Sequence, residues 1–434
     1  MITNRSYEIS AMPTSRDLIA EVEQVHIGET LRWFISEAGP GGYRVETTEC
    51  TDQAPPARKL PVQAQPPSGK TAVISLIPTG IGCSIGGYAG DAGPVTALLA
   101  ETADFLVTNP NAVNASNFIG PEQGVVYTEG YSLDLFSRGE ANLFIPRANK
   151  IGVIVERADD SALAEVFNVI NTVRAVHGVE IVDYVVTEEP IGTRSTRHAS
   201  GAYTGQIDNP DILLSAARRL VSAGATALAV TTNVQDLPAE EYAEHFAGLH
   251  PNPVGGAEAV LSHLLTRTFG IPAAHAPMIT FEALPGAPTV VDARGAGEFI
   301  SVSGMACVLM GLRNAPQLES KPGLGYKAAV GINDVIAVVA PATALGSLPV
   351  LAGAQRGIPV IAVAANTTLL DVNASGLRLP NVVEVDSYLE AAGAVLAIRR
   401  GLSLESVSRP ITSLGAQDHR SGISAKALFP TGRY

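Results

Sequence analysis

From about residue 70 onward, short unbroken apolar runs alternate with longer segments of helical periodicity, and this alternation limits the possible folds more than any other feature. A strand that helices cover on both faces is apolar along its whole length, so the pattern predicts an α/β protein with mainly parallel sheets covered by helices. The strand-like runs are Thr71–Ile77, Phe105–Thr108, Val125–Thr128, Ile151–Val155, Ile181–Val186, Ala227–Thr231, Val335–Ala340, Val360–Ala364 and Val382–Val385. The helical segments are Val95–Ala103, Asp160–His177, Asp211–Ala223, Gly255–Phe269 and Ser387–Arg400.

The first 67 residues have a different character. They contain an acidic helix candidate at Ser15–Val25, a strand-like patch at Thr30–Ile35 and a proline-rich stretch that begins at Pro55. Such proline-rich stretches commonly act as linkers. We predict a small α+β module with a Pro-rich linker at residues 1–67, acting as a lid or a subunit contact. Two related α/β lobes are predicted to follow, at residues 68–250 and 251–434.

Charge and cysteine usage limit the class of function. The formal net charge is −13 and basic residues form no run, which argues against binding to nucleic acid or an anionic membrane. The three cysteines are far apart, with no CxxC pair, and this predicts a reducing compartment. Residues Met1–Glu21 are polar, and prolines interrupt the apolar stretch Val335–Ala365, so neither predicts a signal or a membrane span. The predicted location is cytoplasmic.

A glycine-rich loop, Ile77–Asp91, lies between a strand-like run and a helical one. Such a loop can present backbone N–H groups at a helix N-terminus, which suits an anionic ligand. Its glycines give G-x-G-x-x-x-G, one residue longer than the dinucleotide fingerprint, and no acidic residue follows the next strand. Ser68–Thr71 lacks the first glycine of a P-loop. We therefore predict ligand binding without a nucleotide cofactor. The proposed ligand-binding residues of the loop are Thr79, Gly80, Gly82, Gly86, Gly87 and Tyr88.

Four residues are candidates for acid/base chemistry. Asp91 is either a general base or a cap for the helix that follows the loop. Glu129 lies between two tyrosines in Tyr127–Tyr131, a composition that suits proton transfer and equally an exposed turn. Glu258 and His263 lie on a predicted helix opened by two glycines, five residues apart, so they do not share a face closely.

Histidines at positions 250, 263 and 275 raise the question of a metal site. Together with Glu258 they could converge through the fold as metal ligands, but the spacing of a metalloprotease helix is absent. The alternative is a capped helix with satisfied histidines, and we predict no metal and no other cofactor.

Further substrate-binding candidates occur at strand ends and after them. Arg294 could clamp a carboxylate or pair with Glu298. Polar residues at the carboxyl ends of buried strands can converge on a ligand, although Asn also simply tolerates turn geometry. The candidates of this kind are Asn109, Asn111, Thr343 and Asn366.

Several separated blocks resemble the family described as domain of unknown function 3326, over roughly Thr71 to Ser406. That resemblance implies no established activity, and the chain departs from the family pattern at Ala342–Ser347 and Thr231–Val234. The blocks are Ile77–Asp91, Tyr127–Tyr131, Asn252–His263, His275–Pro277, Asn366–Thr368 and Asp386–Glu390.

Two more distant similarities shape the hypotheses about function. Gly255–His263 is similar to a block of the ring-opening cyclic amide hydrolases, which use serine–lysine dyads, but Val254 stands where their serine precedes the glycines. Thr108–Asn111 and Leu220–Val230 are similar to the two-lobed aspartate/glutamate racemase type, whose paired cysteines have no counterparts at the matching strand ends.

The sequence thus predicts an enzyme with its site between the lobes. Its substrate is a small polar, anionic or amide-bearing metabolite, and its chemistry is hydrolytic, on a cyclic amide or related C–N bond, or otherwise general acid/base, without a redox cofactor. The alternatives are a cofactor-independent isomerase, racemase or lyase, and a non-catalytic regulator that binds a metabolite or nucleotide. No nucleic-acid or membrane partner is expected. The protein is expected to form a homo-oligomer.

Overall fold

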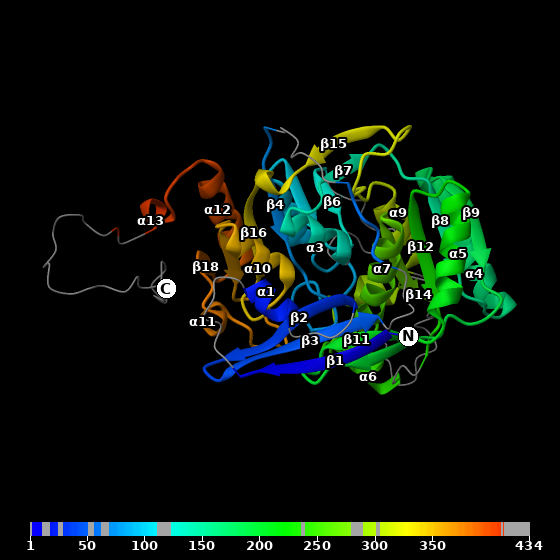
Figure 1. Ribbon diagram of the computed structural model, residues 1–434, viewed down its shortest axis with the longest axis horizontal. Helices are drawn as coiled ribbons and strands as arrows, with labels where there is room; N and C mark the ends of the chain where they lie inside the picture. The colour runs from blue at the N-terminus through cyan, green and yellow to red at the C-terminus, as the bar shows by residue number, and fades with distance from the viewer. Residues whose placement is uncertain are drawn as a thin grey trace, which may run out of the picture.

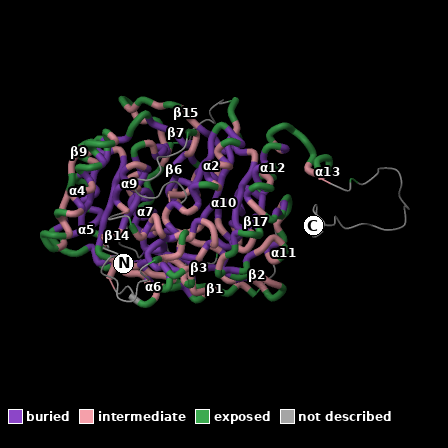
Figure 2. Tube along the Cα trace, turned by 180° about the vertical axis from the view of Figure 1, so that it is seen from behind, coloured by how far each residue is buried: buried purple, intermediate pink, exposed green. Residues whose placement is uncertain are grey.

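A computed structural model describes residues 2–10, 18–24, 29–50, 56–61, 69–110, 123–235, 239–278, 290–300, 304–408 and 411. Two parallel sheets flanked by helices dominate it, which confirms the α/β class predicted from the sequence. Figure 1 shows the two sheets side by side, with helix α7 (Gly255–Phe269) between them and three N-terminal strands crossing below. Apart from the edge strand β9 (Ile181–Val186), the strands of both sheets lie mainly in the buried interior (Figure 2).

The larger sheet has six strands, all parallel. Strands β4, β5 and β6 follow one another toward one edge of the sheet, and β16, β17 and β18 follow one another toward the other edge. The topological switch point therefore lies between β4 and β16. Helices α2 and α12 pack together, as do α3 and α10. In spatial order the strands are β18 (Val382–Val385), β17 (Val360–Val363), β16 (Val335–Pro341), β4 (Ala72–Ser75), β5 (Phe105–Thr108) and β6 (Val125–Tyr127). The helices are α2 (Gly93–Ala100), α3 (Gly130–Arg138), α10 (Leu348–Gln355) and α12 (Tyr388–Arg399).

The second sheet is formed by residues that lie between β6 and β16 in the chain. It has four parallel strands, and helices α5 and α9 pack against it, with α4 against α9. In spatial order the strands are β14 (Ala273–Pro277), β12 (Ala227–Thr232), β8 (Ile151–Val155) and β9 (Ile181–Val186). The helices are α4 (Asp160–His177), α5 (Pro210–Ser222) and α9 (Met305–Leu312).

Smaller elements complete the described part of the chain. Strands β7 (Leu143–Pro146) and β15 (Tyr326–Val330) form an antiparallel pair. Strands β10 (Thr193–Arg197), β11 (Tyr203–Ile207) and β13 (Val234–Gln235) form a small mixed sheet. The remaining short helices are α6 (Ala239–Phe246), α8 (Ala296–Phe299), η3 (Ile332–Asp334), α11 (Ala374–Leu377) and α13 (Leu404–Val407). None of the described helices is long and apolar enough to cross a bilayer.

The N-terminal residues form an antiparallel sheet of three strands, with helix α1 (Leu18–Glu23) between the first two in the chain. This sheet belongs to both hydrophobic cores: Ile35 packs in the core of the six-stranded sheet, whereas Leu31 packs with α5 and α7. It is therefore an integral part of the fold rather than an appended module. In spatial order its strands are β1 (Ile2–Ile9), β3 (Gly42–Cys50) and β2 (Glu29–Gly39).

The predicted lobes do not correspond to the two sheets. The six-stranded sheet takes three strands from before residue 128 and three from after residue 334, and the four-stranded sheet spans residue 250. The predicted boundary at residue 250 is therefore wrong as a division between sheets. Local periodicity locates elements, but which strands pair depends on contacts between residues far apart in the chain.

Candidate functional site

Two cavities lie on either side of the glycine loop. The first, about 230 Å³, is lined by residues that follow β4 and β16 and by residues of β2, α3, α7 and β14, so it lies at the carboxyl ends of the strands that form the switch point. We call it the switch-point cavity. The second, about 210 Å³, is the loop cavity. Polar residues of the switch-point cavity are Arg32, Thr79, Asn109, Glu129, Asp134, Tyr203, Glu258, Ser262, His263, His275 and Ser347. Polar residues of the loop cavity are Tyr88, His245, His250 and Arg294.

Two carboxyl groups enter the switch-point cavity from α3. Glu129 is the N-cap of that helix, and its oxygens accept the backbone N–H groups of Tyr131 and Ser132 at 2.8 and 2.7 Å. Burial nevertheless raises the pKa of Glu129 to about 7. Burial also raises the pKa of Asp134, on the same helix, to about 8, and the nearby Glu129 adds to that rise. At neutral pH Asp134 therefore holds a proton and is a potential acid.

His263, on α7, faces these carboxyl groups. Its Nδ1 lies 2.7 Å from the carbonyl oxygen of Ala259, which can only accept, so Nδ1 carries the proton. Its Nε2 lies 3.9 Å from Oδ2 of Asp134. Burial, with the charge of Arg32, lowers the pKa of His263 to about 3, so the ring is neutral and Nε2 offers a lone pair.

Gly130 explains how the imidazole of His263 reaches this position. A Cβ at residue 130 would lie 2.2 Å from the ring atom Cε1 of His263. The Glu-Gly pair of the Tyr127–Tyr131 segment therefore has two structural roles, which are to cap α3 and to leave room for the ring. In the sequence, these two roles were visible only as a strand-like run that ends in a glycine.

A second carboxylate–histidine pair crosses the cavity from α7 to β14. Oε1 of Glu258, in the first turn of α7, lies 3.7 Å from Nδ1 of His275, and Nε2 of His275 lies 2.9 Å from the Thr232 hydroxyl. The Glu258 side chain is 31% exposed, whereas that of His275 is fully buried. Glu258 is thus a carboxylate that both solvent and a ligand can reach.

The glycine loop itself does not present free amides in the way that the sequence analysis predicted. Asp91 accepts the N–H groups of Gly86 and Tyr88 at 2.9 and 3.1 Å, Glu298 accepts that of Ala89 at 3.0 Å, and Asn366 accepts that of Ile85 at 2.9 Å. Acceptors of the protein's own chain therefore already bind the N–H groups of Gly86 and Tyr88, two of the residues predicted to bind an anionic ligand.

Asp91 thus neither caps α2 nor reaches the switch-point cavity. The N-cap residue of α2 is Ala92, and Asp91 is not among the residues that line either cavity. Burial raises the pKa of Asp91 to about 6. The structure therefore separates this residue from Glu129, Glu258 and His263, with which the sequence analysis grouped it.

Arg294 pairs with a different carboxylate from the one considered in the sequence analysis. Its Nε and Nη2 donate to both oxygens of Asp292 at 2.9 and 3.1 Å, and its guanidinium lies 5.1 Å from the centre of the Tyr88 ring. Glu298 instead binds Ala89 and Asn252. Arg294 lines the loop cavity, away from the carboxyl groups of α3 and α7.

The other predicted binding residues have structural partners. Asn109 lines the switch-point cavity, but its amide bonds both backbone groups of Ile77. Asn366 is fully buried in bonds to Ile85 and Tyr388, so these two asparagines hold the glycine loop at its start and middle.

Among the remaining candidates, Thr79 lines the switch-point cavity and donates to the Gly255 carbonyl at 3.3 Å, while Thr343 pairs with Thr368 at 2.9 Å outside both cavities. Gly82 and Gly87 line the loop cavity, where Gly82 has a positive φ against Pro251. Gly80 and Gly86 line neither cavity and pack against Tyr203 and Ile77. Asn111 lies outside the described residues.

Two groups that the sequence analysis considered for chemistry have structural explanations. The buried Cys83 thiol donates to the Pro78 carbonyl, and burial raises its pKa to about 12, so it is not an activated nucleophile. Within the residues that the structure describes, no three His, Cys, Asp or Glu side chains are arranged to hold a metal ion.

Sequence reasoning missed three polar residues of the switch-point cavity, Arg32, Asp134 and Tyr203. Asp134 gave no signal because an acidic residue within an amphipathic helix is normally assigned to the solvent-exposed face of that helix. Arg32 lies in the strand-like patch of the N-terminal module, which the sequence analysis treated as separate from the site.

Comparisons with known proteins show the family and give no activity. A family model described as "Protein of unknown function (DUF3326)" matches residues 71–408. A protein of Synechococcus sp. named an uncharacterized lipoprotein is 37% identical over 337 residues, which is 77% of this chain and 92% of the relative. That name contradicts the cytoplasmic location predicted from the sequence, and the prediction is therefore withdrawn as wrong. The matched residues begin after β3, so the N-terminal sheet lies outside the family match.

Proposed function

We propose, for a chain that belongs to the DUF3326 family, that the switch-point cavity is the active site of an enzyme that performs general acid/base chemistry on a small anionic or amide-bearing compound. One observation carries the proposal: Glu129, Glu258 and His263, chosen from distant segments of the sequence, line one cavity at the switch point of a doubly wound sheet. Ligands of such sheets bind at that place.

The geometry supports a division of roles between facing helices. Glu258 on α7 is the accessible carboxylate, oriented by His275, and would take a proton from the substrate or from an attacking water. Asp134 on α3 holds a proton at neutral pH and would return one to the leaving group. The Nε2 lone pair of His263 would accept a hydrogen bond from a substrate N–H or O–H group.

A hydrolysis that uses water fits this arrangement better than one that uses a serine–lysine dyad. No lysine is found among the described residues that line the cavity, and the hydroxyl of Ser262 donates to the carbonyls of its own helix. The mechanism of the cyclic amide hydrolases therefore does not transfer to this chain. Acid/base groups on opposite helices favour one alternative, an isomerase that moves a proton from one face of its substrate to the other.

The test is turnover of a defined mixture of small carboxylates, lactones and cyclic imides in D₂O, followed by NMR and mass spectrometry. We expect one class to be hydrolysed, or to gain deuterium without hydrolysis if the enzyme is an isomerase. Glu258→Gln should lower kcat/KM by about 10²–10⁴-fold, the usual range for a lost acid/base group.

The matched control is Arg294→Gln in the loop cavity, which should change kcat/KM by less than about threefold because it touches neither acid nor base. If Arg294→Gln abolishes turnover while Glu258→Gln retains it, the site has been assigned to the wrong cavity. If compounds bind but none is changed, the protein is a binding protein and the enzyme proposal fails.

A further inference from the structure

Arg32 is a half-buried cation on the wall of the switch-point cavity. It lies on β2, in the N-terminal sheet, and lines the cavity beside Trp33 and Phe34. Its Nη1 is shielded from solvent and has no hydrogen-bond partner among the described residues. A buried charged donor without a hydrogen-bond partner lowers the stability of the fold. Its presence therefore indicates a functional role.

The groups around Arg32 do not neutralise its charge. The guanidinium lies 5.9 Å from the centre of the Phe34 ring, and the acidic groups whose charge acts on it are Asp134 and Glu46. Burial raises the pKa of both acids, and for Asp134 it rises to about 8, so that Asp134 carries little negative charge at neutral pH. His198 is neutral, because burial and the charge of Arg32 lower its pKa to about 3.

The strand that carries Arg32 is held firmly at the cavity. On one side, the N–H of Ile35 donates to the carbonyl of Gly346 at 2.9 Å, and a Cβ at residue 346 would lie 2.2 Å from the Ile35 carbonyl oxygen. The N-terminal sheet is thus fixed to the loop after β16, which itself lines the cavity.

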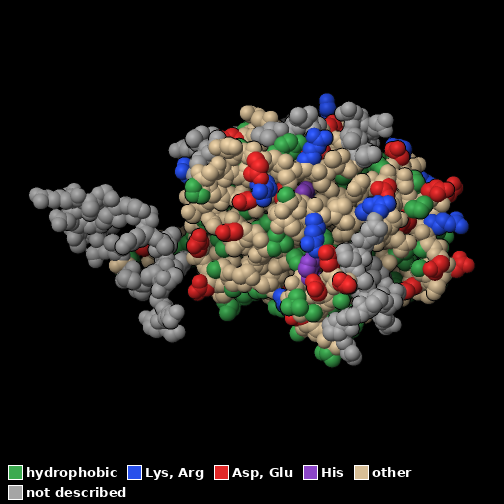
Figure 3. Space-filling view, turned by 90° about the horizontal axis from the view of Figure 1, so that it is seen from below, with side chains coloured by type: hydrophobic (Ala, Val, Ile, Leu, Met, Phe, Trp, Pro, Cys, Tyr) green, Lys and Arg blue, Asp and Glu red, His purple; other side chains and the backbone are tan. Residues whose placement is uncertain are grey.

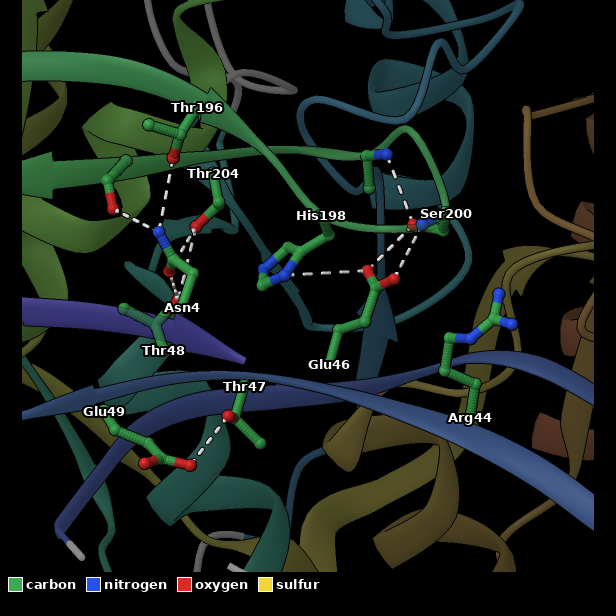
Figure 4. A network of polar contacts seen from close by, with 12 residues as sticks. Asn4, Arg44, Glu46, Thr47, Thr48, Glu49, Thr196, His198, Ser200 and Thr204 are labelled. Atoms are coloured by element: carbon green, nitrogen blue, oxygen red, sulfur yellow. Dashed lines mark hydrogen bonds and ion pairs between the residues drawn. The ribbon is translucent and has the colours of Figure 1, made fainter. Parts of the chain in front are cut away.

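On the other side, a buried polar network joins the N-terminal sheet to the turn between β10 and β11 (Figure 4). Both oxygens of Glu46 accept from Ser200, from its N–H and its hydroxyl, at 2.8 Å each. Asn4 bonds Thr48, Thr196 and Thr204. The strand that carries Arg32 is therefore held in place before a ligand arrives, which lowers the entropy cost of binding.

We propose that Arg32 recognises the carboxylate of a small, partly apolar ligand, so that the N-terminal sheet, which lies outside the family match, completes the binding site. The apolar part of the ligand lies against Trp33, Phe34 and Leu133, which line the same cavity. A carboxylate suits the site better than a phosphate dianion, because Glu129 and Glu258 line the cavity and repel additional negative charge. The inference deepens the proposed function, since it names the substrate class of that same cavity.

The chain offers a direct readout, because Trp33 is its single tryptophan and lines the cavity. The probes are benzoate, its neutral analogue benzamide, and phenyl phosphate, each titrated while Trp33 emission is followed. We expect saturable binding of benzoate, and at least tenfold weaker binding of phenyl phosphate. Arg32→Gln should weaken benzoate binding about 10-fold or more while leaving benzamide binding within about twofold.

The control variant is Arg44→Gln on the neighbouring strand β3, where Arg44 pairs with Glu8 and Glu37 away from the cavity. It should leave benzoate binding unchanged. If Arg32→Gln does not fold, Arg32→Lys replaces it as the test variant. It should bind benzoate several-fold more weakly than the wild type, because lysine lacks the two parallel N–H donors of the guanidinium.

Three results would overturn the inference. These are unchanged benzoate binding in the Arg32 variants, equal loss of benzoate and benzamide binding, and absence of any saturable signal with benzoate. Tighter binding of phenyl phosphate than of benzoate would overturn the choice of carboxylate. Binding is measured without turnover, so a carboxylate site can be established even if the enzyme proposal fails, and the reverse also holds.

Discussion

The two cavities beside the glycine loop differ in whether their arginine already has a partner. In the loop cavity, Arg294 is paired with Asp292, and the Tyr88 hydroxyl donates to the His245 carbonyl at 2.6 Å, although Nε2 of His245 has no hydrogen-bond partner among the described residues. In the switch-point cavity, Nη1 of Arg32, Nδ1 of His275 and the Ser347 hydroxyl have no hydrogen-bond partner among the described residues. Buried polar groups are normally satisfied, so the contrast indicates which cavity is built for a ligand.

The face seen in Figure 3 gives no comparable signal. On the face seen in Figure 3, Lys and Arg side chains are scattered among Asp and Glu rather than gathered in a patch. The contrast between the cavities is therefore the most specific functional feature of the molecule, and three predictions test whether it is real.

The variant with the largest expected effect tests whether the glycine loop is a tightly packed structural element rather than a ligand-binding loop. Gly86 has φ +90, and a Cβ there would lie 2.1 Å from Cγ2 of Ile77. Gly86→Ala should lower the free energy of unfolding by about 2–4 kcal/mol, from left-handed backbone strain and overpacking together. Urea unfolding measures this.

The matched control is Gly357→Ala, because Gly357 also has a positive φ but no atom within 4 Å of the added Cβ. It should cost only about 1 kcal/mol. If Gly86→Ala and Gly357→Ala lower the free energy of unfolding equally, the glycine loop is not tightly packed. The loop would then again be a candidate for ligand binding.

The second prediction compares the pH dependence of a carboxyl group in the switch-point cavity with that of Asp292, the partner of Arg294 in the loop cavity. The pKa of Asp134 is raised to about 8, so between about pH 4 and pH 8 the folded state holds a proton that the unfolded state releases. Stability due to this group falls as pH rises through that window. Asp134→Asn should therefore be more stable than the wild type at pH 8, by at least about 1 kcal/mol, and equal to it near pH 4.

Asp292 should behave in the opposite way. Its hydrogen bonds with Arg294 lower its pKa, so its contribution to stability is present above its ordinary pKa and is lost as pH falls through the folded value. Asp292→Asn should be less stable than the wild type at neutral pH, and the difference should vanish in acid. Thermal unfolding across the pH range measures both variants. Parallel curves would show that the two cavities do not differ electrostatically.

The smallest effect concerns a binding candidate that the structure places outside both cavities. The Thr343 hydroxyl makes a hydrogen bond of 2.9 Å with that of Thr368. Thr343→Val should lower the free energy of unfolding by about 1 kcal/mol or less and leave benzoate binding unchanged. A loss of benzoate affinity would extend the ligand site toward the β16–β17 side of the loop.

The sequence by itself determined the elements. Helices α4 and α7 and strands β5, β8 and β9 have the bounds that periodicity predicted, because each is encoded by the spacing of its own apolar residues. The sequence also selected Glu129, Glu258 and His263, since carboxylates and histidines beside glycines at strand and helix ends stand out locally.

Only the tertiary structure decided which of these groups meet. It put β4 beside β16, brought Arg32 from the N-terminal sheet to the cavity, and satisfied the glycine loop with Asp91, Glu298 and Asn366. Residues 32, 134 and 258 are far apart in the chain, and no local pattern encodes their meeting. It results from strand pairing and from the burial of two cores that share one N-terminal sheet.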